Sequence, residues 1–252
     1  MGISKTQLLL IQKTSMKKTL LLAVLLFAPF CFAAPSDSSA KPAEKEFFTP
    51  EQDKEGLRSN ADIEAKLPNV LILGDSISIG YTLSVRKGLE GVANVVRPKA
   101  NCGDTLAGIA NIETWLGDTK WDVIHFNWGL HDAKLPPEGV RHAPPEVYEQ
   151  NLRRLVTRLR ATGAKLVWAT TTPVPLGGNL APNRRFGSVD SYNAIAARVM
   201  AEFGVVTNDL NAAIAPRMET LGRPKDVHFT AEGSAVLAAH VARSVAALLP
   251  AR

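Results

Sequence analysis

A chain of 252 residues with 46% hydrophobic side chains has enough apolar surface for one substantial core, and it is too short to favour a second full domain. The formal net charge of +5 arises at the N-terminus, where four lysines precede Ala34 without any acidic residue. The rest of the chain has 25 basic against 24 acidic residues and no basic stripe with interleaved aromatic residues, which argues against nucleic acid as a partner.

Residues 1–33 are typical of a secretory signal peptide. Lys17 and Lys18 form a positive region, an apolar stretch of 12 residues follows at Thr19–Phe30, and small residues allow cleavage before Ala34. Residues 1–15 precede a second methionine and are interpreted as an upstream start-site extension. Because a transmembrane helix needs about 20 apolar residues, we expect export to the periplasm or the medium and no stable membrane insertion after cleavage.

The signal is followed by a segment that we interpret as a leader or linker, residues 34–67, which is rich in Ser, Pro, Ala, Lys and Glu. If Cys31 leaves with the signal, Cys102 remains as a single cysteine and no intramolecular disulfide can form. We expect Cys102 to be a buried, unreactive residue of the domain at 68–252.

Short apolar runs alternate with amphipathic segments from residue 68 onward. Strands are predicted at 70–73, 94–97, 121–126, 165–170 and 204–208. Helices are predicted at 78–90, 106–115, 145–162, 190–203 and 231–249. Apolar strands that alternate with helices predict an α/β fold, a three-layer α/β/α sandwich with a mainly parallel five-stranded sheet of the flavodoxin-like kind.

Polar residues with catalytic chemistry follow the predicted strands. The run Gly74-Asp75-Ser76 follows the first strand and precedes a helix. The serine hydroxyl is therefore expected to lie next to the free backbone N–H groups at the helix N-terminus. Gly103 and His131 follow later strands, and the sequence Asp226-Val227-His228 precedes the last helix. Because ligands bind at the carboxyl ends of the strands in open α/β sheets, we expect these residues to form one site.

These motifs resemble the blocks of the SGNH hydrolases, also called GDSL-type esterases, over roughly residues 68–250. The resemblance implies that Ser76 is the nucleophile and that its backbone N–H helps to hold the oxyanion. It implies a second oxyanion N–H from Gly103, within the block Asn101–Thr105, and a catalytic histidine at His228. Acyl transfer would then proceed through a covalent serine ester, without a cofactor or a metal.

The third block departs from the family pattern, because Gly129-Leu130-His131-Asp132 stands where the family has Gly-x-Asn-Asp. His131 can replace the asparagine as an oxyanion donor, since either ring nitrogen can donate. Asn127 is an alternative donor if the loop turns back. In a third interpretation His131 only orders the loop, by bonding Asp132 or a backbone carbonyl.

The second departure concerns the acid, because Lys225 occupies the position three residues before His228 where the family usually has aspartate. Asp226 lies two residues before His228, and alternate side chains of an extended segment share a face. Asp226 can therefore orient the imidazole as the third member of a triad. If it points outward, the site is a Ser–His dyad with a backbone carbonyl as the orienting group.

Exported enzymes that resemble this family most often remove acetyl or similar acyl groups from carbohydrates. Trp128, at a strand end, is a candidate for stacking on a sugar ring, and Asp132 and Arg184 are further candidates for substrate contacts. The expected partner is a small-molecule or saccharide ester. Three alternatives remain open at this point: a non-catalytic glycan-binding module, an acyltransferase, and a lipid esterase of the lysophospholipase type.

Overall fold

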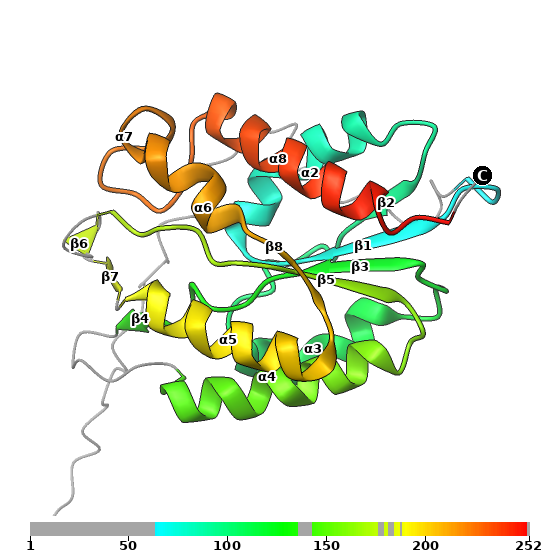
Figure 1. Cartoon of the computed structure of the whole chain (residues 1–252), viewed down its shortest axis with the longest axis horizontal. Coiled ribbons are helices and arrows are strands. Elements are labelled where there is room, and N and C mark those ends of the chain that lie inside the picture. Colours follow the sequence, from blue (N-terminus) through cyan, green and yellow to red (C-terminus); the bar gives the residue numbers. More distant parts are fainter. Residues whose placement is uncertain (1–63, 136–142, 176–178, 181–183, 187, 251–252) are drawn as a thin grey trace, which may run out of the picture. The chain divides into compact units, whose positions relative to one another are not determined.

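The computed structural model describes residues 64–135, 143–175, 179–180, 184–186 and 188–250. The expected signal peptide and nearly all of the expected leader lie outside these residues. Five parallel strands form the central sheet, in the order β2 (Asn94–Val96), β1 (Asn69–Leu73), β3 (Val123–Phe126), β5 (Lys165–Ala169) and β8 (Val206–Asn208) (Figure 1). The predicted mainly parallel five-stranded sheet is confirmed.

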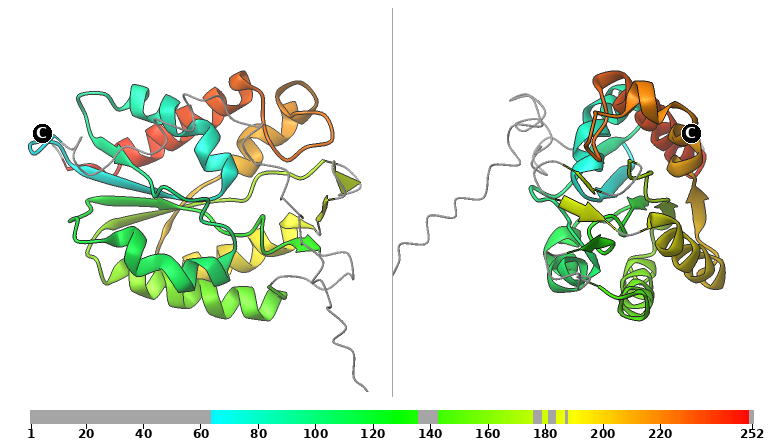
Figure 2. Two further views of the ribbon diagram at one scale, coloured as in Figure 1. Left: turned by 180° about the vertical axis from the view of Figure 1, so that it is seen from behind. Right: turned by 90° about the vertical axis from the view of Figure 1, so that its left-hand side faces the viewer.

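Helices cover both faces of this sheet, as the two further views show (Figure 2). One face carries α2 (Ser76–Gly88) and α8 (Ala231–Ala246), which pack on each other, together with the short helices α6 (Leu210–Ile214), η3 (Ala215–Arg217) and α7 (Met218–Leu221). The other face carries α3 (Thr105–Leu116), α4 (Pro145–Arg160) and α5 (Val189–Phe203). The three-layer sandwich predicted from the alternation of strands and helices is therefore confirmed.

Two apolar clusters, one on each face of the sheet, form the core. Along β1 the side chains alternate between them: Val70 and Ile72 join the cluster under α2 and α8, whereas Leu71 and Leu73 join the cluster over α3, α4 and α5. A strand buried on both faces must be apolar at every position, which explains the continuous run that made this strand predictable.

Local hydrogen bonds explain where the observed boundaries differ from the predicted ones. Helix α2 begins at Ser76 instead of residue 78, because the Asp75 side chain caps it by accepting a hydrogen bond from the Ile77 N–H at 2.9 Å. Strand β3 begins two residues later than predicted. Trp121, at the predicted start, instead donates its indole N–H to the Leu116 carbonyl at the end of α3.

A second, small sheet escaped prediction. It is antiparallel and contains β4 (Lys134–Leu135), β7 (Arg184–Phe186) and β6 (Asn179–Leu180) in that order. These strands have two or three residues each and lie in the connections that follow β3 and β5. Runs this short have no periodicity to detect, and the pairing of β4 with β7 joins segments about 50 residues apart.

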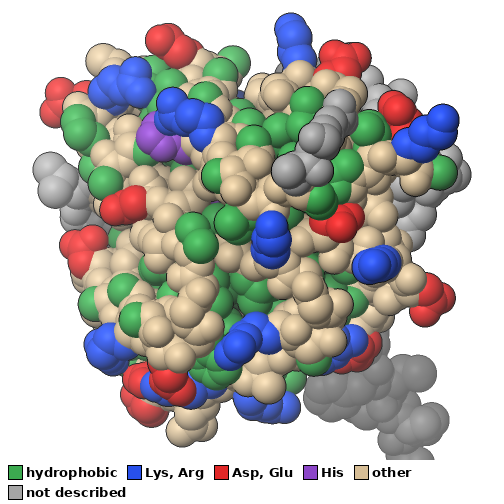
Figure 3. Space-filling model, turned by 45° about the vertical axis from the view of Figure 1, so that its right-hand side comes forward, with side chains coloured by type: hydrophobic (Ala, Val, Ile, Leu, Met, Phe, Trp, Pro, Cys, Tyr) green, Lys and Arg blue, Asp and Glu red, His purple; other side chains and the backbone are tan. Residues whose placement is uncertain are grey.

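The surface charge is mixed on the face that Figure 3 shows, where basic and acidic side chains are interspersed with apolar ones. Among the helices of the described residues, none has both the length and the hydropathy to span a membrane.

Candidate active site

The candidate site lies at the carboxyl edge of the parallel sheet, where β1 has β2 on one side and β3 on the other. The chain order across the sheet reverses at this point, and such a switch point is where open α/β sheets bind their ligands. Ser76 follows β1 at the N-terminus of α2, and His228 enters from the connection that precedes α8.

Ser76, His228 and Asp226 form a continuous chain of hydrogen bonds. The His228 Nε2 lies 2.8 Å from the Ser76 Oγ, although the two residues are 152 positions apart in the sequence. The His228 Nδ1 lies 2.9 Å from the Asp226 Oδ1. All three residues are buried. The order hydroxyl, imidazole, carboxylate is the geometry with which serine hydrolases activate their nucleophile, so the structure favours the triad over the dyad.

A tight turn explains how an aspartate at minus two reaches the imidazole. Residues Arg223 to Asp226 form a turn closed by a hydrogen bond from the Asp226 N–H to the Arg223 carbonyl at 3.2 Å. Pro224 has the restricted φ that suits the second position, and Lys225 adopts a left-handed φ of 54° at the third. After this turn the Asp226 side chain points toward the residues that follow it, where its Oδ1 accepts the Val227 N–H at 2.8 Å and contacts the His228 Nδ1.

The expected oxyanion donors are backbone N–H groups. The N–H of Ser76 lies in the first turn of α2, and no described residue accepts a hydrogen bond from it. Gly103 has a φ of 58°, a conformation that favours glycine, and its N–H donates to the Asn101 side-chain oxygen at 3.0 Å. A substrate oxygen at this N–H therefore competes with the Asn101 side chain.

The third block is held by Asp132. Its Oδ1 accepts the Thr105 hydroxyl at 2.6 Å and the Thr105 N–H at 3.0 Å, which ties this loop to the start of α3. Asp132 therefore orders this loop, and the ordering role considered for His131 stays a prediction. His131 is partly buried, and its role as an oxyanion donor stays a prediction.

Asn127 is partly buried and lines a pocket beside the nucleophile turn, and its amide group donates to the Ala169 carbonyl at 2.7 Å and to the Thr171 hydroxyl at 3.2 Å, so its role as the alternative oxyanion donor stays a prediction. Two other proposed contacts are corrected. Trp128 is wrong as a stacking residue, because it is 1% exposed and its indole N–H bonds the Cys102 carbonyl. Asp132 is wrong as a substrate contact, because it is 0% exposed.

Two further expectations concern side chains away from the triad. The side chain of Arg184 lies outside what the structure describes, so its contact with substrate stays a prediction. Cys102 is buried and free, as expected, and burial raises the pKa of its thiol to about 11. A thiol with a raised pKa is a poor nucleophile, which agrees with the expected inert role.

Burial perturbs two ionisable groups near this edge. It raises the pKa of Asp132 to about 7, against the opposing effect of the hydrogen bonds from Thr105. It lowers the pKa of His125, in the centre of β3, to about 3. Within the described residues, no group of three or more His, Cys, Asp or Glu side chains is placed to hold a metal ion.

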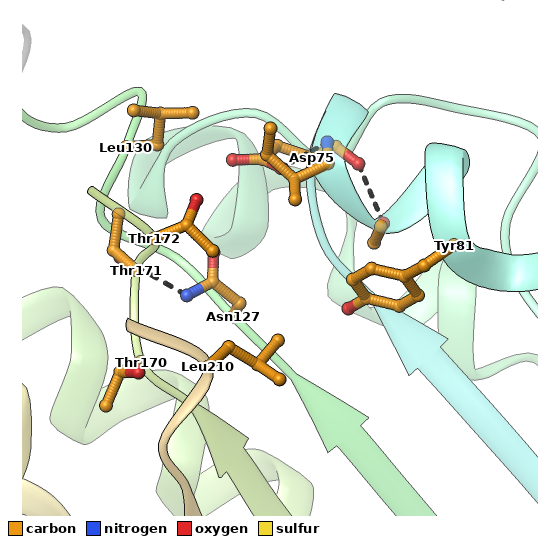
Figure 4. A pocket seen from close by; sticks show the side chains of 10 residues that line it. Asp75, Tyr81, Asn127, Leu130, Thr170, Thr171, Thr172 and Leu210 are labelled. Carbon is orange, nitrogen blue, oxygen red and sulfur yellow. Dashed lines mark hydrogen bonds between the residues drawn. The ribbon is translucent and has the colours of Figure 1, made fainter. Parts of the chain in front are cut away.

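A pocket of about 280 Å³, counted with its open mouth, lies next to the nucleophile turn (Figure 4). Asp75 contributes to its wall from the turn, and Tyr81, Leu130 and Leu210 approach it from three other elements. The remaining lining residues are Ile77, Ser78, Asn127 and the threonines at 170–172. Sequence reasoning missed these threonines, although three hydroxyl residues directly after a buried strand at this edge are a detectable signal.

The parallel sheet and the hydrogen-bonded chain from Ser76 to Asp226 are those of an α/β fold with a candidate hydrolase active site, and comparison with known proteins identifies the family. A family model of the GDSL-like lipase/acylhydrolase family matches residues 72–236. The chain therefore belongs to this family, which supports an esterase or acyl hydrolase activity on a small-molecule ester. The resemblance drawn from the sequence blocks is confirmed.

Solved structures with the same fold include several hydrolases. A lipase/acylhydrolase from Enterococcus faecalis is 19% identical with a TM-score of 0.63, and the match covers 73% of this chain and 98% of that one. Axe2, an acetylxylan esterase from Geobacillus stearothermophilus, is 21% identical with a TM-score of 0.60, and the match covers 73% and 97%. The acetyl xylan esterase AlAXEase is 17% identical with a TM-score of 0.59, and the match covers 70% and 99%. These likenesses show the fold alone. A search of curated proteins finds no match.

Proposed function

We propose that this chain is an exported serine esterase that removes short acyl groups, above all O-acetyl groups, from carbohydrates. The observation that carries the proposal is the hydrogen-bonded chain from Ser76 through His228 to Asp226 at the switch point of the sheet. Membership of the lipase/acylhydrolase family supports the same reaction class.

In the proposed mechanism the Ser76 Oγ attacks the ester carbonyl while the His228 Nε2 takes its proton. Asp226 accepts the Nδ1–H of His228 and stabilises the imidazolium that forms. The N–H groups of Ser76 and Gly103, with the His131 ring as a third donor, hold the tetrahedral oxyanion. His228 then returns the proton to the departing alcohol. In the second half of the reaction His228 takes a proton from water, which attacks the acyl-serine ester, and returns that proton to the Ser76 Oγ as the acid leaves.

An acetyl group on a saccharide is supported by the solved structures with this fold, two of which are acetyl xylan esterases. Export is supported by the positively charged and apolar segments of residues 16–33. N-terminal sequencing of the protein recovered outside the cytoplasm tests the expected cleavage before Ala34.

The decisive experiment measures hydrolysis of para-nitrophenyl acetate and release of acetate from acetylated xylooligosaccharides. We expect the purified protein to be active and to be labelled by a serine-directed phosphonate, and both properties to vanish in Ser76→Ala. A folded protein that does neither would contradict the proposal and favour a glycan-binding module. Transfer of the acetyl group to an added sugar in preference to water would instead show an acyltransferase.

A matched pair of variants tests the third oxyanion donor. His131→Asn places the amide of the family pattern at this position and should keep most of the activity, whereas His131→Ala should lower kcat by about 10²-fold or more. Equal activity of His131→Ala and the wild type would remove His131 from the oxyanion hole.

A further inference from the structure

Arg97, the first residue after β2, is a buried cation with an unusual set of partners. It is 2% exposed, and its Nη2 lies 3.3 Å from each of three oxygen atoms: the carbonyls of Gly74 and Ala100 and the hydroxyl of Ser78. No carboxylate among the described residues lies within ion-pair distance of it. Because a buried charge without an ion pair is costly, its contacts call for a functional explanation.

The contact with Ser78 leads to the nucleophile. The Ser78 hydroxyl accepts from Arg97 and donates to the Asp75 carbonyl at 2.7 Å, shorter than the helical bond of 3.3 Å that the same carbonyl accepts from the Ile79 N–H. The Asp75 carbonyl and the Ser76 N–H belong to one peptide group. A hydrogen bond to the carbonyl polarises that group and makes its N–H a better donor.

The contact with Gly74 joins the two halves of the oxyanion hole. The Gly74 carbonyl accepts from Arg97 and, at 3.2 Å, from the Cys102 N–H, one residue before Gly103. Glycine is required here by close approach, because a Cβ at Gly74 would lie 2.9 Å from the Ser78 Cβ. Arg97 also holds the Ala100 carbonyl of the same loop. One guanidinium therefore contacts both the nucleophile turn and the loop that carries Gly103.

We propose that Arg97 and Ser78 are positioning residues for the oxyanion hole, which fix and polarise the Asp75–Ser76 peptide so that the Ser76 N–H binds the developing oxyanion more strongly. The inference rests on the proposed esterase function and adds two residues to its machinery. Arg97 and Ser78 would stabilise the transition state, where charge develops on the substrate oxygen. Their substitution should therefore lower kcat more than it changes KM.

The expected magnitude follows from two general observations. Removal of a whole oxyanion donor lowers kcat by about 10²–10³-fold. Loss of one bond in a hydrogen-bonded chain weakens the next one by about 10–30%. If Ser78→Ala removes about 10–30% of the two to three powers of ten in kcat that the Ser76 N–H contributes, kcat falls by roughly two- to eightfold.

The chain offers a matched control on the same helix. The Thr82 hydroxyl is also buried and donates to a backbone carbonyl, that of Ser78, at 2.6 Å. The peptide that it polarises reaches the Asp75 carbonyl only through the longer bond of 3.3 Å from the Ile79 N–H. We expect Thr82→Val to change the midpoint of thermal unfolding without the loss in kcat that Ser78→Ala shows. Ser78→Cys, which keeps a weaker donor in place, should have an intermediate kcat.

The assay measures kcat and KM for para-nitrophenyl acetate and the affinity for phenylboronic acid, a tetrahedral mimic of the transition state, in all four proteins. A fall in kcat and in boronate affinity with little change in KM supports the proposal. Equal kcat in Ser78→Ala and Thr82→Val overturns it, and if Ser78→Ala fails to fold, Ser78→Cys against Thr82→Val decides.

Arg97→Lys supplies the second arm, because lysine keeps the charge but lacks the guanidinium whose Nη2 makes all three contacts. If Arg97 acts through Ser78, this substitution lowers kcat less in the Ser78→Ala background than in the wild type. Full additivity overturns the connection between the two residues. An inactive wild type would overturn the esterase function itself, so the two failures are distinguishable.

Discussion

Replacement of His125 by glutamine should remove a specific part of the pH dependence of stability. His125 is fully buried between the edge of the Tyr81 ring and Asn208, whose Nδ2 lies 3.2 Å from the His125 Nε2. Its Nδ1 has no hydrogen-bond partner among the described residues. Burial lowers its pKa from 6.5 to about 3, because an imidazolium here would lose its hydration without gaining a counter-ion.

The sign follows from the two protonation states. Between about pH 6.5 and pH 3 the unfolded chain binds a proton at His125 and the folded protein does not, so the free energy of unfolding falls as the pH falls through this window. At pH 5 the loss is about 2 kcal/mol, and over the whole window it approaches about 5 kcal/mol. The contribution is complete above the unfolded-state pKa.

Urea unfolding of the wild type and of His125→Gln near pH 8 and near pH 5 measures this loss. Glutamine does not titrate, and its side-chain oxygen can accept from Asn208. The difference in free energy of unfolding between the two proteins should therefore change by about 2 kcal/mol in favour of the variant on going to pH 5. Parallel pH profiles of the two proteins would show that His125 does not stay neutral, and the reasoning from burial would fail.

Three further substitutions test the turn, the third block and the triad. Lys225→Gly should stabilise the protein by about 1 kcal/mol in urea unfolding and keep its activity, because glycine adopts the left-handed φ of 54° without strain; a loss of stability would contradict this. The free energy of unfolding of the wild type should fall as the pH rises between about 4 and 7, because the folded-state pKa of Asp132 is raised and the unfolded chain loses its proton first. Asp132→Asn should lack this fall, which amounts to about 3 kcal/mol at pH 6. If the unfolding free energies of the two proteins keep a constant difference over this range, the carboxyl is ionised in the folded state. Asp226→Ala should lower kcat by about 10³–10⁴-fold with the fold intact by circular dichroism, and near-full turnover would establish a Ser–His dyad.

Local sequence patterns predicted the central sheet, the five long helices of the described residues and the family. A doubly buried strand such as β1 must be apolar at every position, and a long helix such as α4, which begins at Pro145 as predicted, shows its period over several turns. The block Gly74-Asp75-Ser76 and His228 before the last helix were recognisable because they match the family blocks, and Asp226 was recognisable as the nearest carboxylate although it lies two residues before His228 instead of three.

Which polar residues face the site could not be predicted from the sequence, because it depends on contacts between distant segments. Trp128 follows a strand, as site residues do, but it is 1% exposed and its indole N–H bonds the Cys102 carbonyl, which places it in the core. Its neighbour Asn127 is partly buried and lines the pocket. The contacts of Arg97 with Gly74 and Ser78 join segments about 20 residues apart, and no local pattern records them. Sequence spacing determines which elements form; the direction of a polar side chain depends on whichever distant donor or acceptor the packed chain brings within about 3 Å.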